Sequence, residues 1–275
     1  MFAGFSPGGI DRMALRRLAV AAVFSGVIGA ALPAAATDLA AHRAVYNLHL
    51  ESTHGGDVEG ATGTMSYEVQ DACDGWAVRQ RLHMVVTNRE GQDIDMLSDY
   101  TTWESKDGRH LRFRTKQTTD QAVTSDIAGE ADLDHNGGTG TAHYSSPDDS
   151  TKQLPPGTLF PMQHTAALIA AAEAGKRFLA VPLFDGTSAT GAQDSFIVAT
   201  KWGGLPPSKW PALAKLPSGR FHIAFFDRGP ETMEPDYEVA LRYWSNGVAD
   251  NLDMDFGDFV MSGTLAEFKL LGRGC

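Results

Sequence analysis

Most of this chain alternates between apolar and polar residues, which is the period of a half-buried β-strand. In residues 42–50 the apolar set begins at Ala44 and recurs at every second position, with mainly polar residues between. Similar segments follow along nearly the whole chain, and Lys106-Asp107-Gly108 and Asn136-Gly137-Gly138 mark two of the reversals. The pattern predicts a mainly β protein with an antiparallel sheet of about 12–14 strands.

The alternation is interrupted once, by an Ala-rich run that predicts a helix. The segment 161–175 follows two tandem prolines, contains six alanines, and carries Glu173 as its only charged residue. Thr165 is the expected N-cap and Gly175 the expected C-terminal stop. A helix with so little charge needs burial on most sides. We therefore expect a large curved sheet wrapped around one buried helix, with its edges closed or covered by loops.

Residues 1–36 have the pattern of a secretory signal peptide. Arg12, Arg16 and Arg17 form a positive region, and the 14 uncharged residues 18–31 are too few for a comfortable membrane span. The small residues 34–36 predict cleavage between Ala36 and Thr37. Met13 precedes the positive region directly and is an alternative start. We expect residues 37–275 to form a single β domain, because no linker-like stretch and no internal repeat divides them.

The chain has two cysteines, Cys73 and Cys275. No cysteine follows the apolar stretch, so we expect a soluble protein of the bacterial periplasm rather than a lipoprotein. In that oxidising compartment the two residues are expected to form one disulfide. Unpaired thiols, or pairing with another molecule, are the alternatives.

Net charge narrows the range of partners. Residues 1–36 carry three arginines and one aspartate, so the remaining 239 residues hold 20 basic and 33 acidic residues. This excess of negative charge disfavours nucleic acid and anionic membrane surfaces as partners of the chain as a whole.

Residues 37–275 contain none of the usual catalytic signatures, such as a G-x-S-x-G or an H-E-x-x-H motif. A row of carboxylates at Asp253, Asp255 and Asp258 suggests an alternative function, a hydrolase that acts on envelope polymers through Asp255 and Asp258. Asp253 and Asp255 alternate with apolar residues, however, which is typical of the solvated face of a strand, and Gly257-Asp258 has the pattern of a turn or bulge.

The histidines give no distinctive metal-ligand spacing. His135 and His143 flank a Gly-rich reversal and are a candidate metal site, although we expect neither a metal nor a cofactor. His164 lies near the start of the predicted helix. It is a candidate general base or, as we expect, a capping or packing residue.

Apolar residues are the remaining candidates for a binding function. Four of them, in or near the predicted helix and the later strands, are candidates for a groove between sheet and helix that accepts a lipid chain or a peptide. These four are Phe160, Leu168, Ile169 and Trp202.

Several segments together resemble one known family. They are, in order, AHRAVYNLHL, YEVQDACDGWAVRQRL, ESKDGRHLRFRT, LPPGTLFPMQHT, FDG at 184–186, and MDFGDFVMSGTLAEFKLL before the final cysteine. The set resembles the EipB family of periplasmic cell-envelope integrity proteins of alphaproteobacteria. It departs from the family at Phe256, where a tyrosine is expected.

The resemblance implies a β-spiral, similar to an open barrel, around a helix, with a disulfide between Cys73 and Cys275. It also implies a non-enzymatic role in keeping the envelope intact under stress, and a functional link to a periplasmic tetratricopeptide-repeat protein. The implied shape is similar to that of lipoprotein carriers, but a shared fold does not fix function. We therefore expect the protein to bind a partner protein or an apolar, lipid- or lipoprotein-like ligand in the concave face of the sheet.

Overall fold

The computed structural model describes residues 38–229, 234–272 and 274. The expected signal peptide and Cys275 lie outside the described residues. The described part of the chain forms one antiparallel sheet of 14 strands and one α-helix. The prediction of a mainly β protein with a large curved sheet around one helix is confirmed.

The helix divides the chain into two runs of strands. Eight strands precede it: β1 (His42–Thr53), β2 (Val58–Asp71), β3 (Gly75–Asn88), β4 (Asp93–Ser105), β5 (His110–Thr119), β6 (Ala122–Leu133), β7 (Gly140–Ser146) and β8 (Ser150–Leu154). The helix α1 (Pro161–Glu173) is followed by six: β9 (Phe178–Leu183), β10 (Gln193–Thr200), β11 (Ser218–Phe226), β12 (Tyr237–Trp244), β13 (Ala249–Asp255) and β14 (Phe259–Leu270).

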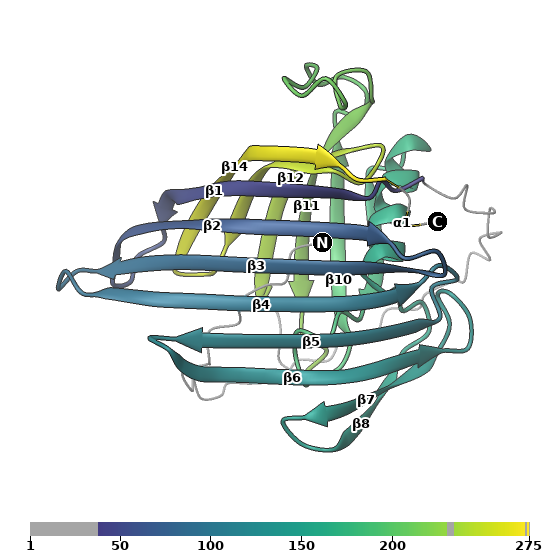
Figure 1. Cartoon of the computed structure of the whole chain (residues 1–275), viewed down its shortest axis with the longest axis horizontal. Coiled ribbons are helices and arrows are strands. Elements are labelled where there is room, and N and C mark those ends of the chain that lie inside the picture. The colour runs from purple at the N-terminus through teal and green to yellow at the C-terminus, as the bar shows by residue number, and fades with distance from the viewer. Residues whose placement is uncertain (1–37, 230–233, 273, 275) are drawn as a thin grey trace, which may run out of the picture.

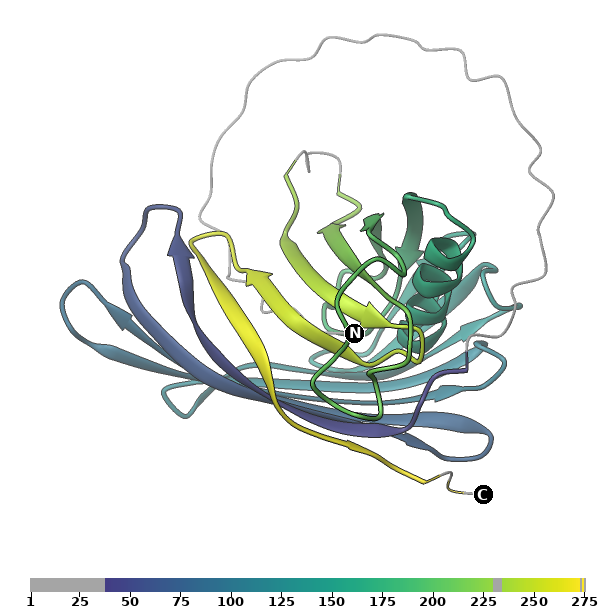
Figure 2. The same ribbon diagram turned by 90° about the horizontal axis from the view of Figure 1, so that it is seen from above.

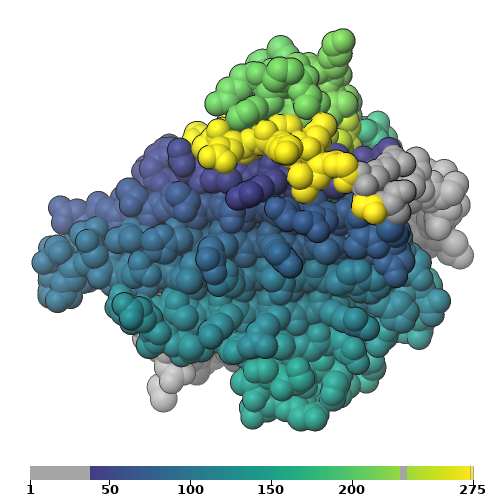
Figure 3. Space-filling model, in the orientation of Figure 1, coloured from purple at the N-terminus to yellow at the C-terminus, as the bar shows by residue number. Residues whose placement is uncertain are grey.

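Each run of strands pairs with its neighbours in chain order, and the two runs join between β1 and β14. The terminal strands of the sheet are therefore β8 and β9, the two strands that α1 connects, and an isolated bridge between Leu159 and Leu183 covers part of the outer edge of β9. The sheet curls so that α1 lies on its inner side, near the later strands (Figures 1 and 2). Figure 3 shows the early strands forming one continuous outer face, with the yellow β14 beside the purple β1.

Burial follows the predicted alternation. Ala44, Tyr46 and Leu48 of β1 are buried, whereas the residues between them are exposed or half-buried. Tyr46 lies opposite Met65 of β2 and Leu265 of β14, so the apolar faces of neighbouring strands coincide. This agreement between pattern and register turns the apolar face of the sheet inward.

The helix begins earlier than its Ala-rich core suggested. Phe160 is the N-cap and Pro161 the first helical residue, a position where the fixed φ and missing N–H of proline cause no loss. The prediction of Thr165 as N-cap is wrong: Thr165 lies inside the helix, where its hydroxyl donates a 3.1 Å hydrogen bond to the carbonyl of Pro161. The predicted stop is confirmed, because Gly175 follows the C-cap with a φ of +75°.

A glutamate from the sheet caps the helix instead. The two carboxyl oxygens of Glu104, in β4, accept hydrogen bonds from the backbone N–H groups of Met162 at 2.7 Å and Gln163 at 2.9 Å. The side chain is completely buried, and this burial raises the pKa of Glu104 to about 8. The carboxyl group satisfies two of the N–H groups that a helix leaves without partners.

The inner face of the sheet has two apolar clusters. The larger one contains Leu168 and Ile169 of α1 and residues from the strands on both sides of the β1–β14 junction. The smaller one lies over β5–β8 and contains Phe160 and Phe184. Phe184 begins the connection between β9 and β10, so this connection fills the part of the inner face that α1 does not reach.

Buried hydroxyl groups hold that connection in place. Tyr100 donates to the carbonyl of Asp185 at 2.8 Å, and Thr115 donates to the carbonyl of Gly186 at 3.4 Å. Gly186 has a φ of +74°, and a Cβ atom there would lie 2.2 Å from the ring of Phe113. The backbone thus approaches the sheet closely, which explains why the FDG segment needs its glycine.

Candidate functional site

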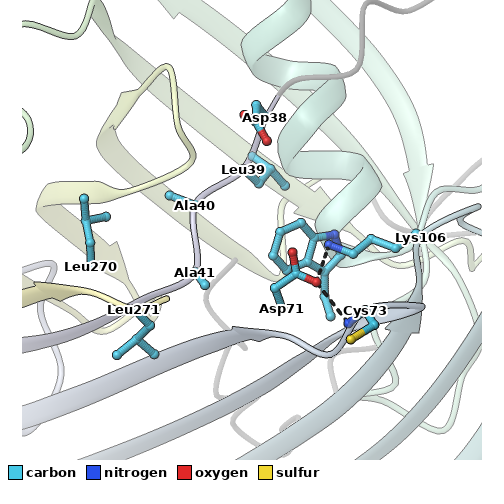
Figure 4. A pocket seen from close by; sticks show the side chains of 10 residues that line it. Asp38, Leu39, Ala40, Ala41, Asp71, Cys73, Lys106, Leu270 and Leu271 are labelled. Carbon is cyan, nitrogen blue, oxygen red and sulfur yellow. Dashed lines mark hydrogen bonds and ion pairs between the residues drawn. The ribbon is translucent and has the colours of Figure 1, made fainter. Parts of the chain in front are cut away.

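A pocket of about 440 Å³ lies at the rim of the sheet, beside α1 (Figure 4). We call it the rim pocket. Four parts of the chain meet there: the segment before β1, the turn between β2 and β3, the turn after β4, and the end of β14. Its lining residues are Asp38, Leu39, Ala40, Ala41, Asp71, Cys73, Trp76, Lys106, Leu270 and Leu271.

The polar centre of the rim pocket is Asp71, at the end of β2. Its Oδ1 atom accepts a 3.1 Å hydrogen bond from the backbone N–H of Cys73 and lies 3.1 Å from Nζ of Lys106. The same Nζ atom lies 3.0 Å from the centre of the Trp76 ring. Asp71 and Trp76 thus hold the ammonium group in place, and Figure 4 shows Lys106 and Cys73 both linked to Asp71.

The local sequence explains why these groups meet. Cys73 adopts a φ of +68°, which lets the chain reverse tightly between β2 and β3. The backbone N–H of Lys106 then donates to the carbonyl of Asp74 at 2.8 Å, which ties the end of β4 to that turn. Trp76 follows at the start of β3 and is almost fully buried.

The apolar wall of the pocket comes from both ends of the described chain. The backbone N–H of Leu271 donates to the carbonyl of Ala41 at 2.8 Å, so the tail continues the pairing of β1 with β14. Leu39 is buried, whereas Leu270 remains 41% exposed. Farther along the tail, a Cβ atom on Gly274 would lie 2.2 Å from the carbonyl oxygen of Asp71, which shows how closely the tail approaches this turn.

A second, much smaller cavity of about 10 Å³ lies behind the segment 38–41. Leu39 and Ala40 line both spaces and therefore form the wall between them. His42 lines the inner cavity, where its Nδ1 lies 2.7 Å from the carbonyl of Ala40. Burial lowers the pKa of His42 to about 4, so its ring is neutral at physiological pH.

The rim pocket combines an ion pair with apolar side chains. Its lining residues include no serine, threonine or histidine, and its cation is already held by a carboxylate. The described residues contain no cluster of three or more His, Cys, Asp or Glu side chains that could hold a metal ion.

The predicted groove residues are separated in the structure. Leu168 and Ile169 lie in the larger cluster and Phe160 in the smaller one, and all three are at most 1% exposed. Trp202 is half-buried and packs edge-on against Phe221. The first three are core residues in this conformation, and a role for any of the four in ligand binding stays a prediction.

His164 is a packing residue. The single proton of the Ser195 hydroxyl is donated to the carbonyl of Val181 at 2.7 Å, so Nε2 of His164 must donate to that hydroxyl at 2.8 Å. Burial also lowers the pKa of His164 to about 3. A ring that donates its proton to the serine cannot act as the base that activates it.

Two of the three aspartates have side-chain partners, and the third lies at a turn. Asp253 forms an ion pair with Arg220, and Asp255 accepts a 2.9 Å hydrogen bond from the N–H of Gly257. Asp258 is exposed in the turn between β13 and β14. The solvated-face interpretation of these residues agrees with their exposure and contacts.

Sequence reasoning missed Glu104, Lys106 and the rim pocket. The missed signal for Glu104 is its phase, because it follows the inward-facing Tyr100 and Thr102 at even spacing in β4. A charged residue at such an apolar position indicates a buried polar contact. Nothing in the sequence shows that Lys106, which was assigned only to a turn, lies over Trp76.

Comparisons with known proteins agree with this fold and cover nearly the whole chain. The family described as EipB-like matches residues 33–272. The chain is 31% identical to the cell envelope integrity protein EipB of Brucella abortus over 259 residues, which is 92% of this chain and 91% of that protein.

A solved structure shows the same likeness. The crystal structure of a β-barrel-like protein from Brucella abortus, assigned to a domain of unknown function, superposes with a TM-score of 0.76 at 30% identity. The match covers 85% of this chain and 99% of that one.

Proposed function

Because the chain belongs to the EipB-like family, we propose that it maintains the integrity of the bacterial cell envelope by binding, without catalysing a reaction, and that it does so in the periplasm. Its relative in Brucella abortus is named for envelope integrity. Among residues 38–229, 234–272 and 274, no helix is long and apolar enough to span a membrane.

The rim pocket is the observation that carries the binding proposal. Its volume of about 440 Å³ lies within the usual range of ligand sites, about 300–1,000 Å³. Its charged residues are Asp38 and the Lys106–Asp71 ion pair, and its apolar residues include Leu39, Leu270 and Leu271. This combination suits an amphipathic ligand with a polar end and a short apolar part, such as a portion of a lipid or an apolar peptide.

Binding at the rim differs from the binding in the concave face that we expected from the sequence. Next to α1 the concave face is occupied by the larger apolar cluster, whose aliphatic and aromatic side chains are almost completely buried. A ligand there would have to displace core residues, whereas the rim pocket is open. Leu39 separates the rim from the helix, so a shift of segment 38–41 would connect the two places.

Native mass spectrometry of gently purified protein tests the proposal. We expect a lipid- or peptide-sized mass to accompany the wild type, and Leu270→Asp and Lys106→Glu to lose it. Lys116→Glu is the matched charge control, because Lys116 is an exposed residue of β5 away from the pocket. Absence of any bound mass, together with no binding of added phospholipid or peptide, would remove the ligand proposal.

A protein is the other ligand that this proposal admits. The family resemblance suggests a periplasmic tetratricopeptide-repeat protein, and the exposed wall at Leu270 would suit an apolar segment of such a partner. Pull-down from periplasmic extract with wild type and Leu270→Asp compares the two cases. A repeat protein retained by both forms would place its contact outside the rim pocket.

A further inference from the structure

Two phenylalanines stand exposed side by side on the outer face of the sheet, far along the chain from the rim pocket residues. Phe178 of β9 is 60% exposed and Phe196 of β10 is 45% exposed. Their rings stack with centroids 6.3 Å apart. The other large apolar side chains that are exposed in the described part of the chain, Val123 and Leu270, belong to different strands.

The apolar surface continues around this aromatic pair. Ala180 lies directly opposite Phe196 across β9 and β10, and Val198 lies directly opposite Phe178. On the other side of β10, Phe196 faces Ala224 of β11. We call Phe178, Ala180, Phe196 and Val198 the β9–β10 patch; it lies at an edge of the sheet, because β9 is the last strand in the sheet order.

The border of the patch is positively charged, although the chain as a whole is acidic. Lys176, Arg177 and Lys201 are exposed beside it, and the Arg177 guanidinium lies 5.8 Å from the centre of the Phe178 ring. The backbone N–H of Ala199 donates to the carbonyl of Arg177. This bond holds the segment with Lys176 and Arg177 next to the end of β10, which Lys201 follows.

Two acidic residues near the patch already have partners. Asp194 lies 2.8 Å from Nη1 of Arg228, and Glu238 lies 3.4 Å from Nε2 of His222. Glu173, at the end of α1, is the exposed acid closest in sequence to Lys176. When the ion-paired Asp194 and Glu238 are set aside, three exposed cations near the aromatic pair compare with one exposed acid, Glu173.

Two other occupants fit this surface less well. In a two-fold pairing with a second copy, the same patch would face itself and bring Lys176, Arg177 and Lys201 of both copies together. Addition of a partner strand along β9 is limited at Pro182, which has no N–H and whose carbonyl already accepts a 2.9 Å hydrogen bond from Leu159. Exposed aromatic rings surrounded by cations are the combination that binds an anionic lipid surface.

We propose that the β9–β10 patch docks the protein on the surface of an anionic phospholipid bilayer. The rings of Phe178 and Phe196 would lie at the level of the lipid headgroups, and the three cations would face the lipid phosphates. The negative charge of the rest of the chain opposes this contact, so binding is weak, sensitive to salt and possible in one orientation only. The total negative charge of the chain disfavours anionic membranes as partners of its average surface. The β9–β10 patch has a positively charged border, so this argument does not apply to it.

Co-sedimentation with vesicles tests the proposal, using phosphatidylcholine alone and phosphatidylcholine with about a third phosphatidylglycerol. We expect the wild type to bind only the anionic vesicles and to dissociate when salt rises from about 0.1 M to about 0.5 M. Lys176→Gln and Arg177→Gln should each weaken binding about fivefold, the effect expected for one cation near such a surface.

The double variant Phe178→Thr, Phe196→Thr should lose most of the binding while its melting temperature stays close to that of the wild type, because both rings are exposed. Val123→Thr is the matched control, since Val123 is 56% exposed on β6, outside the patch.

Three results would overturn the proposal: no wild-type binding to anionic vesicles, equal binding by the double variant, or displacement from vesicles by soluble glycerol phosphate, which would indicate a site for the headgroup alone. The inference does not rest on the rim pocket. The double variant should still carry any ligand seen by mass spectrometry, so the two proposals can fail separately.

Discussion

Two different segments cover the inner face of the sheet, a helix and an irregular connection. They differ in which side chains bind their backbone N–H and carbonyl groups. Over the larger cluster lies α1, whose first N–H groups are bound by the buried carboxyl of Glu104. Over β5–β8 lies the irregular segment from Phe184, whose carbonyls are bound by neutral hydroxyls such as that of Tyr100. A curved sheet that encloses a backbone segment must supply hydrogen-bond partners for the N–H and carbonyl groups of that segment. Here one part uses an ionisable side chain and the other mainly neutral side chains.

We call the region around α1 the helix-filled part of the inner face, and the region over β5–β8 the loop-filled part. The helix-filled part also contains the rim pocket. Leu39 separates that pocket from the helix, and two buried histidines are neutral, His42 beside α1 and His164 within it. Regions that bind ligands tend to be those that open locally at low cost. We therefore expect the helix-filled part to be the less stable and more pH-sensitive of the two.

The largest expected effect on stability concerns the predicted disulfide between Cys73, beside the helix-filled part, and Cys275. A Cys73–Cys275 disulfide would close a loop of roughly 200 residues, and loop entropy puts its stabilisation at no more than about 5 kcal/mol. Reductant, Cys73→Ser and Cys275→Ser should lower the melting temperature of the protein by similar amounts. The close approach of Gly274 to Asp71 supports the pairing. An unchanged melting temperature in reductant would reject it.

The next effect tests the loop-filled part. Phe184 is fully buried and packs edge-on against Phe113 and Phe160. Phe184→Ala should reduce the free energy of unfolding by about 3–5 kcal/mol, as for other buried aromatics. The exposed Phe178 provides the control, and Phe178→Thr should change that free energy by less than about 0.5 kcal/mol. Similar values for the two variants in denaturant titrations would mean that the segment after β9 does not form part of the core.

Removal of the helix cap should have a smaller effect. Glu104→Ala leaves the N–H of Met162, which is buried, and that of Gln163, which is part-buried, without their acceptor; a fully buried group of this kind costs about 1–3 kcal/mol and a part-buried one less. We expect a total loss of about 2–4 kcal/mol for Glu104→Ala and about 1–2 kcal/mol for Glu104→Gln, which keeps one acceptor oxygen. Equilibrium unfolding at about pH 6 measures both losses. Equal stability of all three proteins would show that water caps the helix equally well.

The smallest effect concerns the hydrogen bond from the neutral Tyr100 hydroxyl to the segment between β9 and β10. Tyr100→Phe removes the donor to the carbonyl of Asp185 and keeps the ring, so a loss of about 1–2 kcal/mol is expected. Because the lost group is neutral, the difference from the wild type should be the same at about pH 6 and about pH 9. A difference that grows with pH would contradict the contrast between the two fillings.

Sequence reasoning predicted the parts of the fold that depend on local periodicity. Strand alternation around Tyr46, the turn at Gly108 and the helix stop at Gly175 were all visible, because each depends on residues near in sequence. The start of the helix was placed too late at Thr165, because the group that caps it comes from β4 and not from the helix segment. Contacts between distant segments leave no periodic signal.

The candidate site could be predicted even less. The apolar character of Phe160, Leu168 and Ile169 was recognised correctly, but hydrophobicity does not distinguish a core residue from one that lines a groove. The rim pocket depends on Lys106 and Leu270 lining the same space, and they are far apart in the sequence. Only the register of the whole sheet brings them together.

The pH dependence of the helix-filled part follows from three buried groups. The pKa of Glu104 is raised by burial from 4.5 to about 8, so its contribution to stability is complete below pH 4.5 and is lost as pH rises toward 8. His42 and His164 have lowered pKa values, about 4 and about 3, so stability is lost as pH falls below 6.5. In the loop-filled part, burial also raises the pKa of Asp185, and the N–H and hydroxyl of Thr187 oppose this rise.

Amide hydrogen exchange of the wild type and Glu104→Gln, at about pH 6 and about pH 9 and corrected for intrinsic rates, tests the contrast most directly. In the wild type, the free energy of opening for amides of α1 should fall between the two pH values, and in Glu104→Gln it should stay constant. Amides of the segment that begins at Phe184 should show the same pH response in both proteins. An α1 whose protection is independent of pH in the wild type, or that loses protection equally in Glu104→Gln, would contradict the account.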